Sequence, residues 1–163
     1  TKLEIMAATN AMHEWTPEGI AELERIHGEL QMAKCAGDVT RILRANVHFH
    51  FALYGEKRRS YLMTMVRTLW AITGPSIRFL YEEGRPLDTS GRHPHADVIE
   101  ALRRQDRAML ERAIADDMSE TGRKILQVLR EKVSPEALAV QPFGKMELLR
   151  TRAKQGRKIQ LED

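Results

Sequence analysis

The segment that decides the fold is residues 39–55, VTRILRANVHFHFALYG. Asn46 and His50 are four positions apart in it, so both side chains leave the same face of a helix, one turn apart. A polar pair that faces a hydrophobic core needs partners there. The segment therefore predicts a buried helix that carries part of a site. Its apolar residues recur with the spacing of one helix face: Val39, Ile42, Ala45, Phe49, Ala52 and Leu53.

The same helical period continues on both sides of this segment. We find no run with the period of a β-strand and no internal repeat, and residues 83–91 form the clearest loop. The sequence therefore predicts an all-α fold, an antiparallel bundle of about six to seven helices. The expected helices are one ending near Glu14, one from Pro17 to about Cys35, one after Asp38, one from about Arg59 to Glu83 with a break at Gly74-Pro75, one from Pro94 to about Arg104, and one capped by Asp106.

Composition and charge predict one helical domain with a tail. The chain has 163 residues, of which 42% are hydrophobic and 30% charged, enough apolar material for a real core. We assign residues 1–133 to the helical domain and residues 134–163 to a partly basic C-terminal extension, because the apolar pattern weakens after Ser134-Pro135. The net charge of +3 is carried by residues 144–163. A broad basic surface for nucleic acid is therefore not expected in the domain itself.

Localisation follows from what the sequence lacks. Cys35 is the only cysteine, which fits a reducing compartment, and we expect its side chain to be buried as a small apolar group. No apolar run approaches the length of a membrane span, and the N-terminus lacks the pattern of a signal peptide. These features predict a soluble cytoplasmic protein with no membrane partner.

Two more residues join Asn46 and His50 as site candidates. His95 lies at the opening of the helix that begins at Pro94, and Asp117 lies on the apolar side of the last helix. A carboxylate that points inward is costly unless it is hydrogen-bonded, paired or bound to a metal. From spacing alone, both a metal site and a set of hydrogen-bonded core residues remain open. His27 and His93 receive no site role, and His48 is expected to be exposed.

Several motifs carry a resemblance to a known family. Asn46, Phe49, His50 and Leu53 match an Asp/Asn-x-x-Phe-His-x-x-Leu signature, which is similar to that of the C-terminal effector-binding (FCD) domain of FadR-type regulators in the GntR family. The opening of the chain, with Leu3-Glu4, also resembles this domain. A further segment resembles the family pattern at His95, Val98, Ala101, Leu102 and Asp106. The resemblance covers residues 2–129.

The resemblance implies a divalent transition metal, with Zn or Ni expected. Carried over by position, the family's four ligands fall on Asn46, His50, His95 and Asp117. Asn46 replaces an acid and Asp117 replaces a histidine, so one carboxylate is kept among the four residues. Asparagine is a weak neutral ligand. The alternative is a hydrogen-bond network of the same four residues around an organic effector or water.

The resemblance also implies a function. We expect an effector-sensing, dimerising domain of a bacterial transcriptional regulator, in which a small organic acid completes the coordination of the metal. Arg67 and Arg78 are the candidates for pairing with its carboxylate. DNA would be bound only by a winged helix-turn-helix that this chain lacks, and no catalysis is expected. The alternatives are a metal-dependent helical enzyme and a helical interaction module, the latter predicting that the four residues do not converge.

Overall fold

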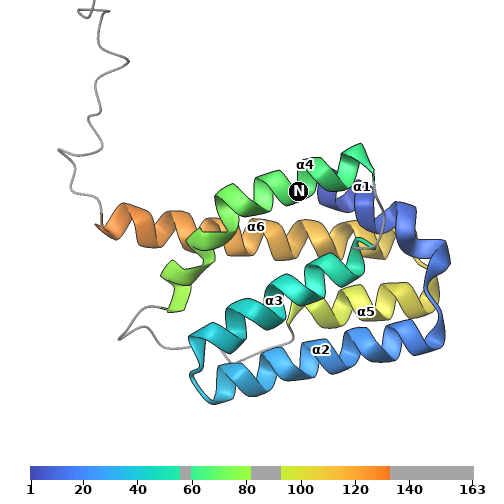
Figure 1. Ribbon diagram of the computed structural model, residues 1–163, viewed down its shortest axis with the longest axis horizontal. Helices are drawn as coiled ribbons and strands as arrows, with labels where there is room; N and C mark the ends of the chain where they lie inside the picture. Colours follow the sequence, from blue (N-terminus) through green and yellow to red (C-terminus); the bar gives the residue numbers. More distant parts are fainter. Residues whose placement is uncertain (56–59, 82–92, 133–163) are drawn as a thin grey trace, which may run out of the picture. The chain divides into compact units, whose positions relative to one another are not determined.

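The computed structural model describes residues 1–55, 60–81 and 93–132. Within these ranges the chain forms six α-helices, two 3-10 helices and no strand (Figure 1), which confirms the predicted all-α fold. None of the described helices has the length and hydropathy needed to cross a membrane. Residues up to Leu129 form one compact unit. The elements are α1 (Lys2–Ala11), η1 (Met12–Glu14), α2 (Pro17–Cys35), α3 (Val39–Leu53), α4 (Tyr61–Thr73), η2 (Gly74–Tyr81), α5 (Pro94–Arg104) and α6 (Arg107–Lys132).

Local capping interactions set the helix starts. The side chains of Thr16, Asp38, Ser60 and Asp106 each accept a hydrogen bond from the backbone N–H three residues later. Each such bond satisfies one of the free donors at a helix start. The predicted break at Gly74-Pro75 is the point where α4 gives way to the 3-10 helix η2. Proline has no backbone N–H to continue the α-helical ladder.

A tight turn at Gly37 joins α2 and α3 into an antiparallel pair. Gly37 has a φ of 67°, in the left-handed region that a side chain disfavours. Helix α2 packs against both α3 and α5, and α1 packs against α4 (Figure 1). This arrangement puts the inner faces of α3 and α5 close together.

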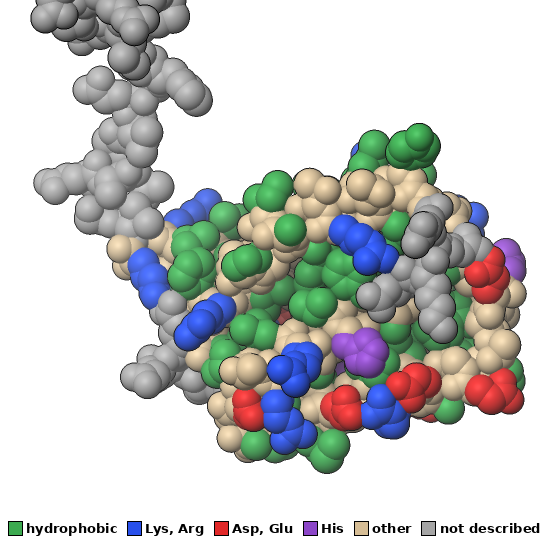
Figure 2. All heavy atoms as spheres, in the orientation of Figure 1, with side chains coloured by type: hydrophobic (Ala, Val, Ile, Leu, Met, Phe, Trp, Pro, Cys, Tyr) green, Lys and Arg blue, Asp and Glu red, His purple; other side chains and the backbone are tan. Residues whose placement is uncertain are grey.

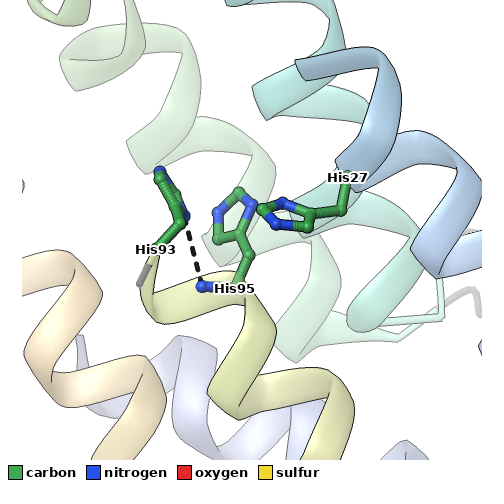
Figure 3. Close-up of side chains that lie close together, drawn as sticks. All are labelled: His27, His93 and His95. Carbon is green, nitrogen blue, oxygen red and sulfur yellow. Dashed lines mark hydrogen bonds between the residues drawn. The ribbon is translucent and has the colours of Figure 1, made fainter. Parts of the chain in front are cut away.

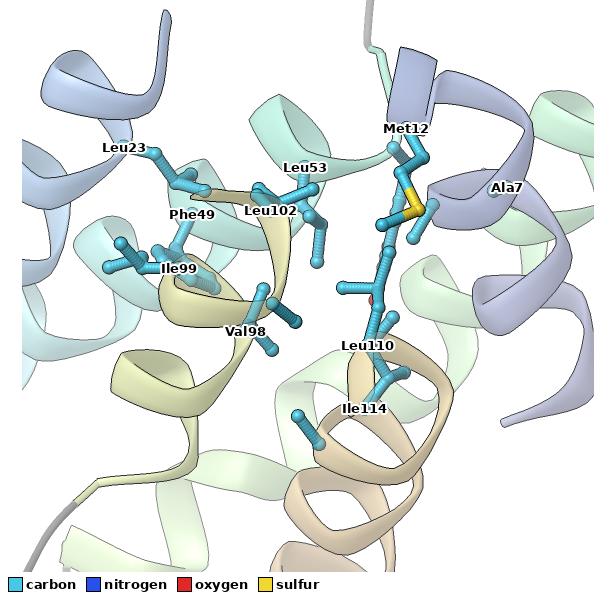
Figure 4. Close-up of a cluster of buried hydrophobic side chains, with 14 of the residues drawn as sticks. Ala7, Met12, Leu23, Phe49, Leu53, Val98, Ile99, Leu102, Leu110 and Ile114 are labelled. Atoms are coloured by element: carbon cyan, nitrogen blue, oxygen red, sulfur yellow. The ribbon is translucent and has the colours of Figure 1, made fainter. Parts of the chain in front are cut away.

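One hydrophobic core links all six α-helices (Figure 4). Phe49, Leu102 and Leu110 are completely excluded from solvent in it. A smaller cluster lies between the C-terminal end of α2 and the N-terminal half of α3 and contains Leu30, Ala33, Ile42 and Ala45. The core includes Ala7, Ala8, Met12, Ile20, Leu23, Ile26, Leu53, Tyr54, Met63, Val66, Val98, Ile99, Ala101, Ala113 and Ile114.

One expectation about burial was wrong. Cys35 is exposed, because it is the last residue of α2 and lies beyond the apolar stripe that ends at Ala33. On α4, Met63 and Val66 are buried in the core, whereas Met65 and Leu69 are 55% and 48% exposed. The predicted loop at residues 83–91 and the predicted extension at residues 134–163 lie outside the described residues.

Two glycine substitutions should have opposite effects on stability. Gly37→Ala is expected to lower the free energy of unfolding by about 1 kcal/mol, because a Cβ disfavours its left-handed conformation. Gly28→Ala is expected to raise it by about 0.5–1 kcal/mol, because Gly28 lies inside α2 and a Cβ there meets nothing within 4 Å. Urea unfolding measures both changes. Shifts of the same sign would contradict this account of the turn.

Candidate metal centre

Three of the predicted site residues converge in the interior. His50 on α3 places its Nε2 3.3 Å from Oδ2 of Asp117 on α6. His95 on α5 places its Nε2 3.7 Å from the same oxygen and 3.4 Å from Nε2 of His50. All three side chains are buried. Two imidazole nitrogens and one carboxylate oxygen therefore face a common point between three helices.

Burial keeps both imidazoles neutral. Loss of solvent lowers the pKa of His50 to about 3, although the nearby Asp117 acts in the opposite direction. Burial also lowers the pKa of His95 well below its ordinary value. At neutral pH, neither histidine therefore supplies a positive charge to balance the Asp117 carboxylate. Neutral imidazole and carboxylate are the ligands that divalent transition metals such as zinc prefer, and a cation would supply the missing charge.

A buried hydrogen-bond chain determines which nitrogen of His50 is free. The Tyr54 hydroxyl donates to Oε1 of Glu4 at 3.3 Å, and it lies 3.1 Å from Nδ1 of His50. Burial raises the pKa of Tyr54 well above 10, so the hydroxyl keeps its proton. Because that proton is donated to Glu4, the hydroxyl accepts from Nδ1–H of His50. The lone pair of His50 is then on Nε2, facing Asp117, as in histidines that bind metals.

Aromatic side chains hold the two histidines in place. Trp70 on α4 donates from Nε1 to Oε1 of Glu4 at 2.7 Å, and its ring centroid lies 5.0 Å from that of His50. Phe49 stacks on His95 with 3.7 Å between ring centroids and an interplanar angle of 4°. The orientation of each imidazole thus depends on neighbours from other helices. Such supporting contacts commonly tune metal affinity.

Asn46 lies on α3 one turn before His50 and is half-buried. Its position puts it on the same helix face as His50. A contribution of its amide to the site stays a prediction. The interaction-module alternative predicted no convergence of Asn46, His50, His95 and Asp117, whereas His50, His95 and Asp117 do converge.

The two predicted arginines lie at the surface. Arg67 on α4 is exposed, with its guanidinium carbon 5.7 Å from the ring centroid of Phe51. Arg78 on η2 is also exposed. Contact of either side chain with a carboxylate ligand stays a prediction.

Sequence reasoning missed several residues around the centre. Glu4 and Tyr54 form the hydrogen-bond chain to His50. In the sequence, Glu4 could have been noticed as an acid within an alanine-rich helix, and Tyr54 as a tyrosine four positions after His50. His27 and His93 lie beside His95. His27 follows the buried Leu23 by four positions, which was its signal for an inward direction. His48 is exposed, as predicted.

Removal of the Tyr54 hydroxyl should weaken metal binding. Tyr54→Phe keeps the buried ring but leaves Nδ1–H of His50 without its acceptor. We therefore expect a 10- to 100-fold loss of zinc affinity, the usual effect of mutating a residue that hydrogen-bonds to a metal ligand. Competition with a chromophoric chelator measures the affinity. The control is Tyr61→Phe, which removes a hydroxyl from a side chain that is 90% exposed. Equal affinities of the two variants would contradict the tautomer assignment.

The fold and the site together define an all-helical domain with a buried candidate ligand site at the centre of the bundle. The FCD domain model matches residues 1–120. The chain therefore belongs to the FCD family, a regulatory domain of GntR-family transcriptional regulators.

Two further comparisons agree with this assignment. The chain is 29% identical over 123 residues to the HTH-type transcriptional regulator McbR of Escherichia coli strain K12, a match that covers 73% of this chain and 54% of that protein. The solved structure of E. coli McbR/YncC superposes with a TM-score of 0.68 at 29% identity, covering 77% of this chain and 63% of that one. The chain thus spans little more than half the length of this relative.

Proposed function

We propose that this domain senses a small organic acid through a bound divalent transition metal, Zn²⁺ or Ni²⁺. His50, His95 and Asp117 would hold the ion, with Asn46 as the fourth ligand. The observation that carries the proposal is the convergence of three buried donor atoms, two imidazole nitrogens and one carboxylate oxygen, which lie 3.3–3.7 Å apart. A buried carboxylate between neutral imidazoles is stabilised by a cation.

The metal would act as a recognition element. When bound, it would supply the positive charge that attracts the carboxylate of an effector, and we expect no turnover. Arg67 and Arg78 are the proposed additional partners of that carboxylate, since guanidinium offers two parallel donors. The residues of this chain would orient the ligands and exclude water from the site.

Effector binding would be transmitted through the helices that meet at the centre. His50, His95 and Asp117 come from α3, α5 and α6, and Glu4 connects the site to α1. A ligand that stabilises one arrangement of these helices shifts the population of the whole domain. In a longer cytoplasmic regulator, this shift would change DNA binding by a separate helix-turn-helix module, the type of module that the name of McbR records.

A carboxylate-dependent thermal shift tests the proposal. Metal-loaded and chelator-treated protein are each mixed with small mono-, di- and tricarboxylates, and with the corresponding neutral amides as controls. We expect an acid to raise the Tm of the loaded protein only, since a ligand at a hundred times its Kd adds about 2.7 kcal/mol of stability. The same shift in the chelator-treated protein would contradict a metal-mediated site.

We further propose that α4 carries the homodimer interface. Four apolar side chains form a stripe along its exposed face at helical spacing. Figure 2 shows apolar side chains along the line of α4, whereas charged side chains gather over α2. A symmetric dimer can bury one such stripe against its copy. The stripe consists of Tyr61, Met65, Leu69 and Ile72, which are 90%, 55%, 48% and 70% exposed.

A charge within this stripe should produce monomers. Ile72→Glu would place a carboxylate against the apolar α4 stripe of the second copy. We therefore expect the dimer to dissociate at micromolar concentration. Light scattering after size-exclusion chromatography measures the mass. Met32→Glu is the control, because Met32 is 59% exposed on α2, outside the stripe. Dimers that persist in Ile72→Glu would exclude this interface.

A further inference from the structure

A second group of histidines lies on the other side of His95. His27 comes from α2, His93 precedes α5, and His95 lies in the first turn of α5 (Figure 3). One ring nitrogen from each lies within 4.8 Å of the others. The ring centroid of His27 is 5.5 Å from that of His93 and 5.6 Å from that of His95. Three imidazoles from two parts of the chain thus surround one point.

Two nitrogens of these histidines have no hydrogen-bond partner within the described part of the chain. They are the buried Nδ1 atoms of His27 and His95. Nε2 of His95 already faces His50 and Asp117. The two nitrogens of one imidazole point in divergent directions, so Nδ1 of His95 belongs to a different location from the Asp117 centre. A buried polar atom without a partner is costly, which favours a bound group here.

The chemistry of this group is that of neutral imidazoles. Burial lowers the pKa of His93 to about 3, and it also lowers the pKa of His27. The group of histidines contains no carboxylate. Mg²⁺ and Ca²⁺ prefer oxygen ligands, whereas Zn²⁺, Ni²⁺ and Cu²⁺ bind imidazole well. Half-buried His27 and His93 also leave the group more accessible than the buried Asp117 centre.

We propose that His27, His93 and His95 form a second site for a divalent transition metal ion, separate from the Asp117 centre. A neutral imidazole has one lone pair, so the two sites compete for His95. Nδ1 of His93 accepts the backbone N–H of His95 at 3.2 Å, and an ion bound through that lone pair displaces this cap bond. Metal binding at the second site therefore changes the environment of the His95 backbone amide.

The test uses the full chain with the first centre removed. In His50→Ala/Asp117→Asn protein, Zn²⁺ titration followed by calorimetry should show one ion per chain. Adding His27→Ala should abolish this binding, whereas adding His48→Ala, at an exposed histidine on α3, should leave it unchanged. Absence of binding in the folded double variant, or binding that His27→Ala does not affect, would overturn the proposal.

Circular dichroism shows whether the double variant folds. If it does not, the conservative Asp117→Asn variant replaces it, and nitrogen NMR of the imidazoles reports which rings bind Zn²⁺. We expect shifts at His27 and His93 together with the backbone amide of His95. Shifts confined to His50 and Nε2 of His95 would overturn the second site. If the Asp117 centre binds no metal in wild-type protein, the shifts expected at His27, His93 and the His95 amide do not change. The two proposals can therefore fail independently.

Discussion

In a His27→Ala background, which removes the proposed second site, replacement of Asp117 by asparagine is expected to reduce bound metal from about one ion per chain to near zero. Asp117 supplies the carboxylate oxygen that lies 3.3 Å from His50 and 3.7 Å from His95. Asparagine has nearly the same shape but no charge, so the site loses its one anionic ligand while the packing is preserved. Metal affinity depends directly on deprotonated ligands. Elemental analysis of protein purified without chelator measures the ion content.

Two further variants test whether the loss of metal is specific to the proposed ligands. Asp116→Asn is the matched control, because Asp116 is the exposed neighbour of Asp117 on α6 and its loss should leave the ion content unchanged. His50→Ala should lose the ion as Asp117→Asn does. A wild-type chain that holds no ion even after reconstitution would reject the metal centre. The same residues would then form a hydrogen-bonding pocket for another class of effector.

Replacement of Phe49 by alanine is expected to lower the free energy of unfolding by about 3–5 kcal/mol. Phe49 is completely buried at the meeting point of α2, α3 and α5, and its ring stacks directly on His95. Alanine would leave a cavity there and remove the surface that orients the His95 imidazole. Denaturant unfolding of the chelator-treated protein measures the loss without any contribution from metal binding.

A leucine at the same position separates packing from orientation. Phe49→Leu retains much of the side-chain volume, so we expect a loss of about 1.5 kcal/mol or less. It cannot stack on His95, and zinc affinity should therefore fall in both variants. Phe51→Ala is the control, because Phe51 is half-buried at the edge of the core. A stability loss below about 1 kcal/mol in Phe49→Ala would contradict its central position.

The sequence by itself determined the helices and their starts. Capping by Thr16 and Asp38 uses partners only three residues away, so the relevant contacts can be read along the chain. The spacing of Asn46 and His50 on one helix face is local in the same sense. Cys35 shows the limit of such reasoning, because an apolar residue near a helix end has no local sign of its exposure.

Only the tertiary structure decided how the site is assembled. Tyr54 and Glu4 are 50 positions apart, and His95 and His50 are 45 apart, yet both pairs meet in the interior. The resemblance to FCD domains grouped His50 with His95, but it gave no sign of the Glu4 chain or of His27 beside His95. Such contacts depend on how each helix is rotated and placed against its neighbours. That geometry results from the packing of the whole core, in which no single segment determines its own position.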